Sequence, residues 1–92
     1  MVLEELHAVL RERKVAPPEG SYTAELLADP ERISRKIMEE AFEVCLELGR
    51  PSVSAERTAE EAADLLYHLL VGLVSVDVDV AEVLSVLEGR RR

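Results

Sequence analysis

Two stretches of the sequence place acidic residues inside an apolar helical pattern. They are KIMEEAFEV at residues 36–44 and AEEAADLLYHLLVGL at residues 59–73. Each stretch holds a pair of carboxylates spaced three residues apart, and the pairs are Glu40 with Glu43 and Glu61 with Asp64. Side chains at this spacing are neighbours on a helix, with Cβ atoms about 5–6 Å apart. Each pair can therefore bind one ligand together.

Carboxylates beside a protein core need a partner. Burying one unpaired carboxylate costs several kcal/mol, or shifts its pKa until the group is neutral, and several such groups in one cleft repel one another. A cation is the usual resolution, and ligands that are all oxygen suit a hard ion such as Mg²⁺. We therefore predict a magnesium site formed by four carboxylates, which are Glu40, Glu43, Glu61 and Asp64.

These carboxylates have two other possible interpretations. The first is a solvated acidic face with ion pairs one helical turn apart, such as Lys36 with Glu40 and Arg57 with Glu61. The second is a di-iron bundle, which requires Glu-x-x-His on two helices. The residue three after Glu61 is Asp64, so the di-iron interpretation is disfavoured. Two acidic motifs on otherwise apolar helices favour the magnesium site.

The elements that must position these residues are all predicted to be helices. Apolar residues at helical spacing predict a first helix over residues 2–13, followed by a loop at 15–20 and a short helix at 23–28. Asp29 as N-cap and Pro30 begin a long helix that ends after Leu48, before Gly49. The sequence thus predicts an all-α fold of four to five helices.

The second half of the chain continues this pattern. A third main helix is predicted from near Ser54 to about Ser75, with His68 as a hydrogen-bonded core histidine and Gly72 as a point of close helix approach. Residues 74–80 alternate with period two, but a lone strand has no partner, so a loop is preferred. A final helix has an inner face of Val80, Val83, Leu84 and Leu87 and ends at Gly89; Arg90, Arg91 and Arg92 are expected to form a solvated tail.

Composition limits the classes of function. The 92 residues are 48% hydrophobic, which is enough for one domain, expected over residues 1–92, with a core of its own. A net charge of −8 disfavours nonspecific nucleic-acid binding. No apolar run approaches the roughly 20 residues of a membrane span, and no signal peptide is recognisable. The single cysteine, Cys45, is expected to be buried, in a protein of the cytoplasm.

The two long helices carry more apolar surface than one small chain can cover. Opposite its inner stripe the second helix has Met38, Phe42 and Leu46, and the third has Leu66, Leu70 and Val74 turned away from its acidic residues. A soluble monomer rarely exposes an apolar patch of that size. We therefore expect a homo-oligomer, most simply a two-fold dimer.

The acidic motif also resembles that of a known family. Glu39-Glu40-x-x-Glu43, then 17 residues, then Glu61-x-x-Asp64, is similar to the motif of the all-α nucleotide pyrophosphohydrolases, the MazG-like superfamily. Within it, the chain resembles the phosphoribosyl-ATP pyrophosphohydrolases of histidine biosynthesis. Four further features carry this closer resemblance: ERK at 12–14, GSYTAELL at 20–27, Lys36 just before the acidic pair, and EEAADLLYHLLV at 60–71.

The resemblance implies a reaction and roles for individual residues. The reaction is the Mg²⁺-dependent hydrolysis of phosphoribosyl-ATP to phosphoribosyl-AMP and pyrophosphate. The four carboxylates are the implied metal ligands, and Glu39 is a candidate base or second-metal ligand. Lys36 is an implied phosphate contact, with an ion pair to Glu40 as the alternative. Other implied substrate contacts, for which packing and helix capping are the alternative, are Lys14, Ser21, Tyr22 and Thr23.

Two departures from the family pattern and two rival functions remain. Family members usually have glycine just before the acidic pair, where this chain has Met38, and the stretch GRPSVSAERTA between the two motifs is only loosely similar to the family. Neither departure removes a predicted ligand. The chain could instead be a housecleaning enzyme that hydrolyses other nucleoside triphosphates. It could also be a noncatalytic helical interaction module with a solvated acidic face. Metal binding separates the module from the enzymes.

Overall fold

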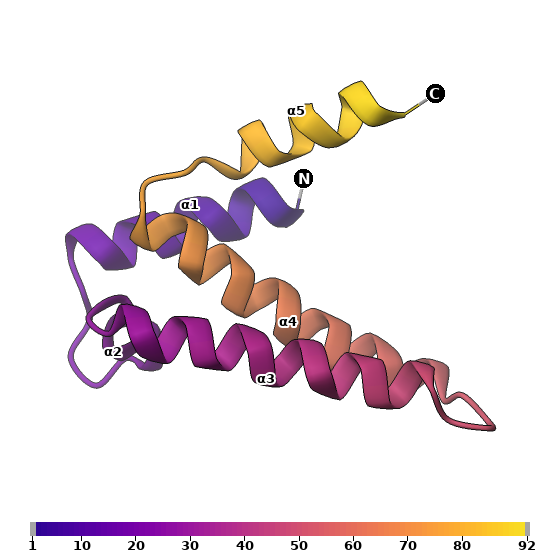
Figure 1. Ribbon diagram of the computed structural model, residues 1–92. Helices are drawn as coiled ribbons and strands as arrows, with labels where there is room; N and C mark the ends of the chain where they lie inside the picture. Colours follow the sequence, from indigo (N-terminus) through magenta and orange to yellow (C-terminus); the bar gives the residue numbers. More distant parts are fainter. Residues whose placement is uncertain (1, 92) are drawn as a thin grey trace.

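Two long antiparallel helices, joined by a short loop, form the frame of the molecule (Figure 1). In this computed structural model, which describes residues 2–91, they are α3 (Pro30–Leu48) and α4 (Ala55–Ser75). Their mutual contact is the most extensive between any two elements of the described chain. The acidic stretches lie one on each of these helices, so the hairpin brings them face to face.

Local sequence signals set the ends of both helices. Asp29 is the N-cap of α3 and accepts a hydrogen bond from the Arg32 backbone N–H at 3.2 Å, and Pro30 occupies the first helical position. Ser54 caps α4 in the same way, accepting from the Arg57 backbone N–H at 3.2 Å. The predicted boundaries of the two long helices are confirmed.

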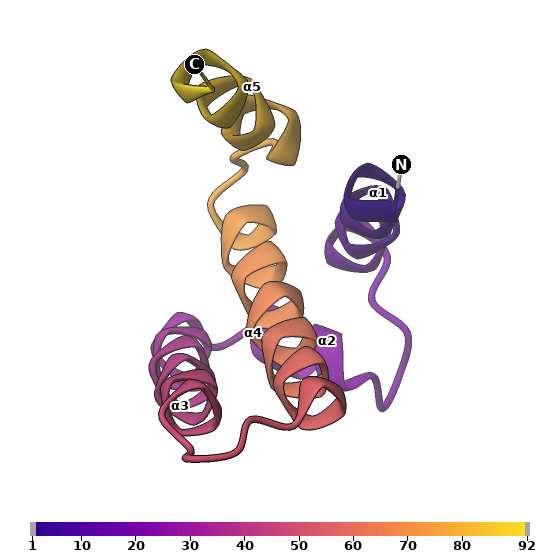
Figure 2. The ribbon, with the colours of Figure 1, turned by 90° about the vertical axis from the view of Figure 1, so that its right-hand side faces the viewer.

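Three shorter helices lie to one side of the hairpin. They are α1 (Val2–Val15), α2 (Tyr22–Leu27) and α5 (Val80–Arg90). Helix α1 packs on α4, α2 contacts α1, α3 and α4, and α5 lies against α1 (Figure 2). The described residues thus contain five helices and no strand, which confirms the predicted all-α fold. None of these helices is long and apolar enough to span a membrane.

Some predicted boundaries differ from the structure. Helix α1 continues two residues beyond the predicted end, to Val15, and α2 begins one residue early because Ser21 is its N-cap. The prediction that Gly89 ends the last helix is wrong, because α5 continues to Arg90. Arg92, the last residue of the predicted tail, lies outside the described residues. The segment between α4 and α5 is a loop, as predicted, with Asp77 at φ 58°.

The core lies where α1, α2, α3 and α4 meet. Its buried apolar residues are Leu10, Leu26, Ile33, Leu70, Val71, Val74 and Val80. At its centre the two long helices approach closely at Gly72, as predicted. A Cβ atom there would lie 3.3 Å from Ile37 Cδ1 and 3.4 Å from Ile33 Cγ2.

Three predictions about burial are wrong for the isolated chain. Leu70 and Val74 do not face outward but belong to the core, because α1 and α2 cover that side of α4. Cys45 is exposed rather than buried, since it lies beside the uncovered face of α3. Leu87 is also exposed. Helix α5 packs mainly on α1, and it contacts the core through Val80 and Leu84 in its first turns, before Leu87.

Candidate metal and substrate site

Three carboxylates converge between the two long helices. Glu40 and Glu43 come from α3 and Glu61 from α4, and one oxygen of each lies within 4.8 Å of the others. Glu40 is buried, Glu61 is half-buried and Glu43 is exposed. The group therefore extends from the helix interface to the surface, where a ligand could reach it.

Two oxygens of this group are buried without a partner. Glu40 Oε2 and Glu61 Oε2 are inaccessible and accept no hydrogen bond within the described chain. A buried, unsatisfied carboxylate oxygen is costly. An ion coordinated by carboxylate oxygens would satisfy both, and a donor set made only of oxygen fits a hard divalent cation. The residues present therefore fit the predicted metal.

Mutual repulsion changes the acidity of the cluster. Burial raises the pKa of Glu40, and the charge and hydrogen bond of Glu43 and the charge of Asp64 raise it further, while Lys36 opposes the shift. The pKa of Glu61 is raised to about 7 by its hydrogen bond with Glu43, by burial, and by the charges of Glu43, Asp64 and Glu40. Without a cation, Glu40 and Glu61 therefore hold a proton more readily than an isolated glutamate does.

Asp64, the fourth predicted ligand, is placed slightly apart. Its carboxylate lies outside the group of three that could share one ion, and its side chain is exposed. Its charge nevertheless acts on both Glu40 and Glu61, so it lies at the edge of the same cluster. The set of four ligands stays a prediction, and the structure brings three of them together.

Lys36 and Glu39 flank the cluster on α3. Lys36 Nζ lies 3.4 Å from Glu39 Oε2 and 3.6 Å from Glu40 Oε1. Burial alone would lower the pKa of Lys36, but the hydrogen bond to Glu39 and the nearby Tyr22, Glu39 and Glu40 together raise it. Lys36 is thus a cation at the border of the site, paired with the exposed Glu39 and the buried Glu40.

Helix α2 supplies a polar and aromatic wall. Ser21 caps the helix, its Oγ accepting from the Ala24 backbone N–H at 3.3 Å. Thr23 is buried and hydrogen-bonded through Oγ1 to the Tyr67 hydroxyl, so packing accounts for both residues. Tyr22 is different because its ring is 40% exposed.

A directed hydrogen-bond chain joins Tyr22 to the acidic helix. His68 is buried; its Nδ1 lies 2.8 Å from the Asp64 carbonyl and its Nε2 lies 3.0 Å from the Tyr22 hydroxyl. A carbonyl only accepts, so Nδ1 carries the proton, and Nε2 then accepts from the hydroxyl. This confirms His68 as a hydrogen-bonded core histidine. It also fixes Tyr22 relative to Asp64.

Lys14 is not brought to the cluster. Its Nζ donates to the carbonyl of Val74 at 3.2 Å, near the C-terminus of α4, and lies 2.8 Å from Asp77 Oδ1. A lysine at this position satisfies helix-terminal carbonyls and complements the negative end of the helix dipole. The contacts of Lys14 therefore favour the capping alternative over a substrate contact.

Sequence reasoning missed Arg32 near this site. Its guanidinium lies 5.5 Å from the centre of the Tyr22 ring, and its NH1 lies 3.7 Å from Glu25 Oε2. Arg32 precedes Lys36 by one helical turn, so the spacing on α3 could have indicated it. Arg32 also lies in the first turn of α3, shortly after Asp29 and Pro30, where the sequence pattern indicates the start of a helix rather than a binding site.

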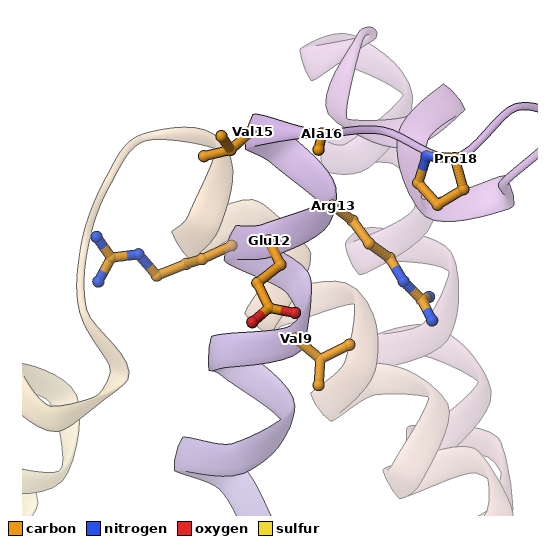
Figure 3. Close-up of a pocket in the computed structure, with 7 residues that line it drawn as sticks. Val9, Glu12, Arg13, Val15, Ala16 and Pro18 are labelled. Carbon is orange, nitrogen blue, oxygen red and sulfur yellow. The ribbon is translucent and has the colours of Figure 1, made fainter.

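A separate surface groove lies beside α1 (Figure 3). It has a volume of ≈ 710 Å³ and is lined by Val9, Arg11, Glu12, Arg13, Val15, Ala16 and Pro18. None of the predicted site residues lines it. The cluster between α3 and α4 remains the better candidate, because its chemistry and its unpaired oxygens both indicate a ligand.

These features define a class of protein: a small all-α protein that gathers carboxylates between two antiparallel helices. The profile of the family described as PRA-PH, phosphoribosyl-ATP pyrophosphohydrolase, matches residues 3–91. A phosphoribosyl-ATP pyrophosphatase of Cereibacter sphaeroides is 51% identical over 90 residues, which cover 97% of this chain and 85% of that protein. The corresponding protein of Methanoregula boonei is 45% identical over 96 residues, or 99% of this chain and 88% of that protein.

A fused relative is also similar. The histidine biosynthesis bifunctional protein HisIE of Pyrococcus furiosus is 44% identical over 92 residues, covering 99% of this chain but 42% of that protein. The chain described here belongs to the phosphoribosyl-ATP pyrophosphohydrolase family, which confirms the resemblance stated from its motifs. It is a hydrolase acting on a phosphoanhydride bond.

Proposed function

We propose that this chain catalyses the Mg²⁺-dependent hydrolysis of phosphoribosyl-ATP to phosphoribosyl-AMP and pyrophosphate, a step of histidine biosynthesis in the cytoplasm. The observation that carries the proposal is the pair of buried carboxylate oxygens, on Glu40 and Glu61, that have no partner in the described chain. A chain of this family with an acidic site needs a cation between itself and an anionic nucleotide.

Glu40, Glu43, Glu61 and Asp64 would hold the ion. When bound, Mg²⁺ would supply positive charge to the phosphate oxygens and favour ionisation of an attacking water. Glu39, whose carboxylate is exposed, would accept the proton of that water or help hold a second ion. Lys36 would exchange its contacts with Glu39 and Glu40 for a phosphate oxygen.

Substitution of the cluster tests this proposal directly. Glu40→Gln, Glu61→Gln and Asp64→Asn should each keep the helical circular dichroism of the wild type and reduce hydrolysis by at least about a hundredfold. Calorimetric titration should show weaker Mg²⁺ binding for the same variants. Glu60→Gln, which changes the exposed neighbour of Glu61, should behave as the wild type. Normal turnover in all three cluster variants would overturn the assignment.

A substrate panel separates the rival functions. The wild type is offered phosphoribosyl-ATP, ordinary nucleoside triphosphates and damaged ones, each with Mg²⁺, and released pyrophosphate is measured. We expect phosphoribosyl-ATP to give the highest kcat/KM. Preference for a damaged triphosphate would indicate a housecleaning enzyme. Absence of both hydrolysis and Mg²⁺ binding would indicate a noncatalytic helical module.

The protein is also proposed to act as a homo-oligomer, most simply a dimer. Met38 and Phe42 are each 64% exposed and Leu46 is 50% exposed, all on the side of α3 away from the core. Leu66 and Leu69 on α4 are exposed as well. A second copy covering this face would remove the apolar area from water.

A further inference from the structure

Phosphoribosyl-ATP, the substrate proposed above, carries negative charge at two separate ends. One end is the triphosphate, and the other is the 5-phosphate of the second ribose, which ATP lacks. The carboxylate cluster, through its ion, accounts only for the triphosphate. In a chain with a net charge of −8, the second phosphate needs a cation of the protein within reach of the cluster.

The two ends of the cluster differ in the cations that they offer. Toward the loop between α3 and α4, Arg50 is committed to the buried Glu47, with its Nε and NH2 donating at 3.0 and 3.2 Å. Toward the N-terminus of α3, Arg32 makes an ion pair to Glu25 at 3.7 Å, with 39% of the Arg32 side chain and 60% of the Glu25 side chain exposed. An exposed ion pair of this kind contributes little energy, so Arg32 can exchange Glu25 for a ligand.

Arg32 is aligned with the cluster and held in place. It lies on the same face of α3 as Lys36 and Glu40, two helical turns or about 12 Å along the axis from Glu40. Its guanidinium lies over the Tyr22 ring, which His68 fixes through the hydrogen bond to Nε2. Tyr22 also packs with its ring edge-on to His68. A planar guanidinium held on an aromatic ring is preorganised for bidentate binding of a phosphate.

We infer that Arg32, supported by Tyr22, binds the phosphate of the second ribose and so makes the site selective for phosphoribosyl-ATP over ATP. This inference rests on the proposed function and adds to it the residue that recognises the substrate's distinguishing group. Lys36, between Arg32 and Glu40, remains a contact for the triphosphate. His68 acts as a positioning residue because it touches Tyr22 and Asp64 rather than the substrate.

The test compares kcat/KM for phosphoribosyl-ATP and for ATP, with Mg²⁺ saturating. Arg32→Gln should lower the value for phosphoribosyl-ATP by about ten- to a hundredfold, the range of one charged hydrogen-bonded contact, mainly through KM, and leave the value for ATP little changed. Arg32→Lys should lose part of the preference, because lysine keeps the charge but cannot donate two parallel hydrogen bonds to the phosphate. Thermal melting should show that both variants are folded.

Two controls isolate the contact. Arg57→Gln removes the same charge from the loop end of α4. It should change kcat/KM for phosphoribosyl-ATP and for ATP by the same factor. Glu25→Gln removes the carboxylate that competes for Arg32, and should preserve the preference. If Arg32→Gln lowers kcat/KM equally for both substrates, or for neither, the inference is wrong while the proposed function stands. If Glu25→Gln abolishes the preference, the inference is also wrong, because Arg32 then acts through its ion pair with Glu25 and not on the substrate. A wild type with no preference would overturn the proposed function and the inference together.

Discussion

The raised pKa of Glu61 makes the stability of the folded protein depend on pH. The pKa of Glu61 is raised to about 7 by its hydrogen bond with Glu43, by burial, and by the charges of Glu43, Asp64 and Glu40. In the unfolded chain its pKa returns to the ordinary value of 4.5. Between these two values the folded protein binds more protons than the unfolded chain, so its stability falls as the pH rises.

The first prediction follows from that sign. Without metal, the contribution of Glu61 to the melting temperature should be largest below about pH 4.5 to 5. It should be lost as the pH rises through about 7. Glu61→Gln should flatten this decline and melt higher than the wild type at pH 8. Differential scanning fluorimetry in chelator over this pH range provides the measurement.

Added Mg²⁺ should reverse the same dependence. Its ligands must be ionised, so binding is weak while the cluster holds its proton and strengthens above about pH 7. The rise in melting temperature on adding Mg²⁺ should be larger at pH 8 than at pH 5.5, and should be lost in Glu61→Gln. Equal stabilisation at both pH values would contradict a carboxylate site for the ion.

Lys36 allows a prediction about binding rather than folding. Lys36→Met removes the cation beside Glu39 and Glu40 while keeping the length of the side chain. We expect a KM raised by about tenfold or more, the effect of one charged contact, with Mg²⁺ binding retained. Steady-state kinetics and a metal titration check this. A change in melting temperature alone would mean that Lys36 serves only as an ion-pair partner.

At the scale of elements, the α3–α4 contact positions the whole site. The helices can bring their carboxylates together because Gly72 has no side chain where Ile33 and Ile37 press against α4. These residues lie within two turns of Glu40 and Asp64 along their helices. Spreading the helices here would also separate the carboxylates.

Enlarging Gly72 should therefore reduce both stability and activity. Gly72→Val adds methyl groups where even a Cβ atom would meet Ile37 at 3.3 Å, so we expect destabilisation of about 1–3 kcal/mol. Chemical denaturation measures the stability and Mg²⁺ titration measures the site. Gly89→Ala on α5 is the control, since nothing lies within 4 Å of its added Cβ. Equal effects of the two substitutions would show that backbone propensity, not packing, dominates.

How far the sequence predicted these elements depended on whether the signal was local. Asp29, Pro30, Gly49 and Ser54 act on backbone groups a few residues away, so both long helices were predicted within a residue. Burial depends on distant partners instead. Periodicity identified the apolar faces of α4, but not that α1 and α2 cover Leu70 and Val74.

The same distinction holds for the site. Glu40, Glu43 and Glu61 were predicted because spacing within one helix, together with the family motif, places them on facing sides of a hairpin. The contact of Lys14 with the end of α4 joins residues 60 positions apart, and no pattern in the sequence indicates it. Arg32 was missed because its position over Tyr22 depends on how α2 packs against α3.

At the scale of the whole molecule, the outer face of α3 exposes large apolar side chains to water. Phe42 is the largest side chain on it and is 64% exposed. Sedimentation at micromolar concentration should show the wild type as a dimer or larger oligomer, and Phe42→Glu should dissociate it because a carboxylate there would be desolvated. A monomeric wild type would refute the proposal. An oligomeric Phe42→Glu variant would place the interface elsewhere, with exposed residues of α4 as the next candidates.

The exposed thiol of Cys45 makes the protein its own sensor of assembly. It is the only cysteine in the sequence and lies on α3 beside the Phe42 and Leu46 face. A maleimide dye would therefore attach at one defined position per chain, without any engineered residue. Slow labelling at high protein concentration and fast labelling after dilution would report how tightly the copies associate. Labelling of Phe42→Glu would give the reference rate for a free chain.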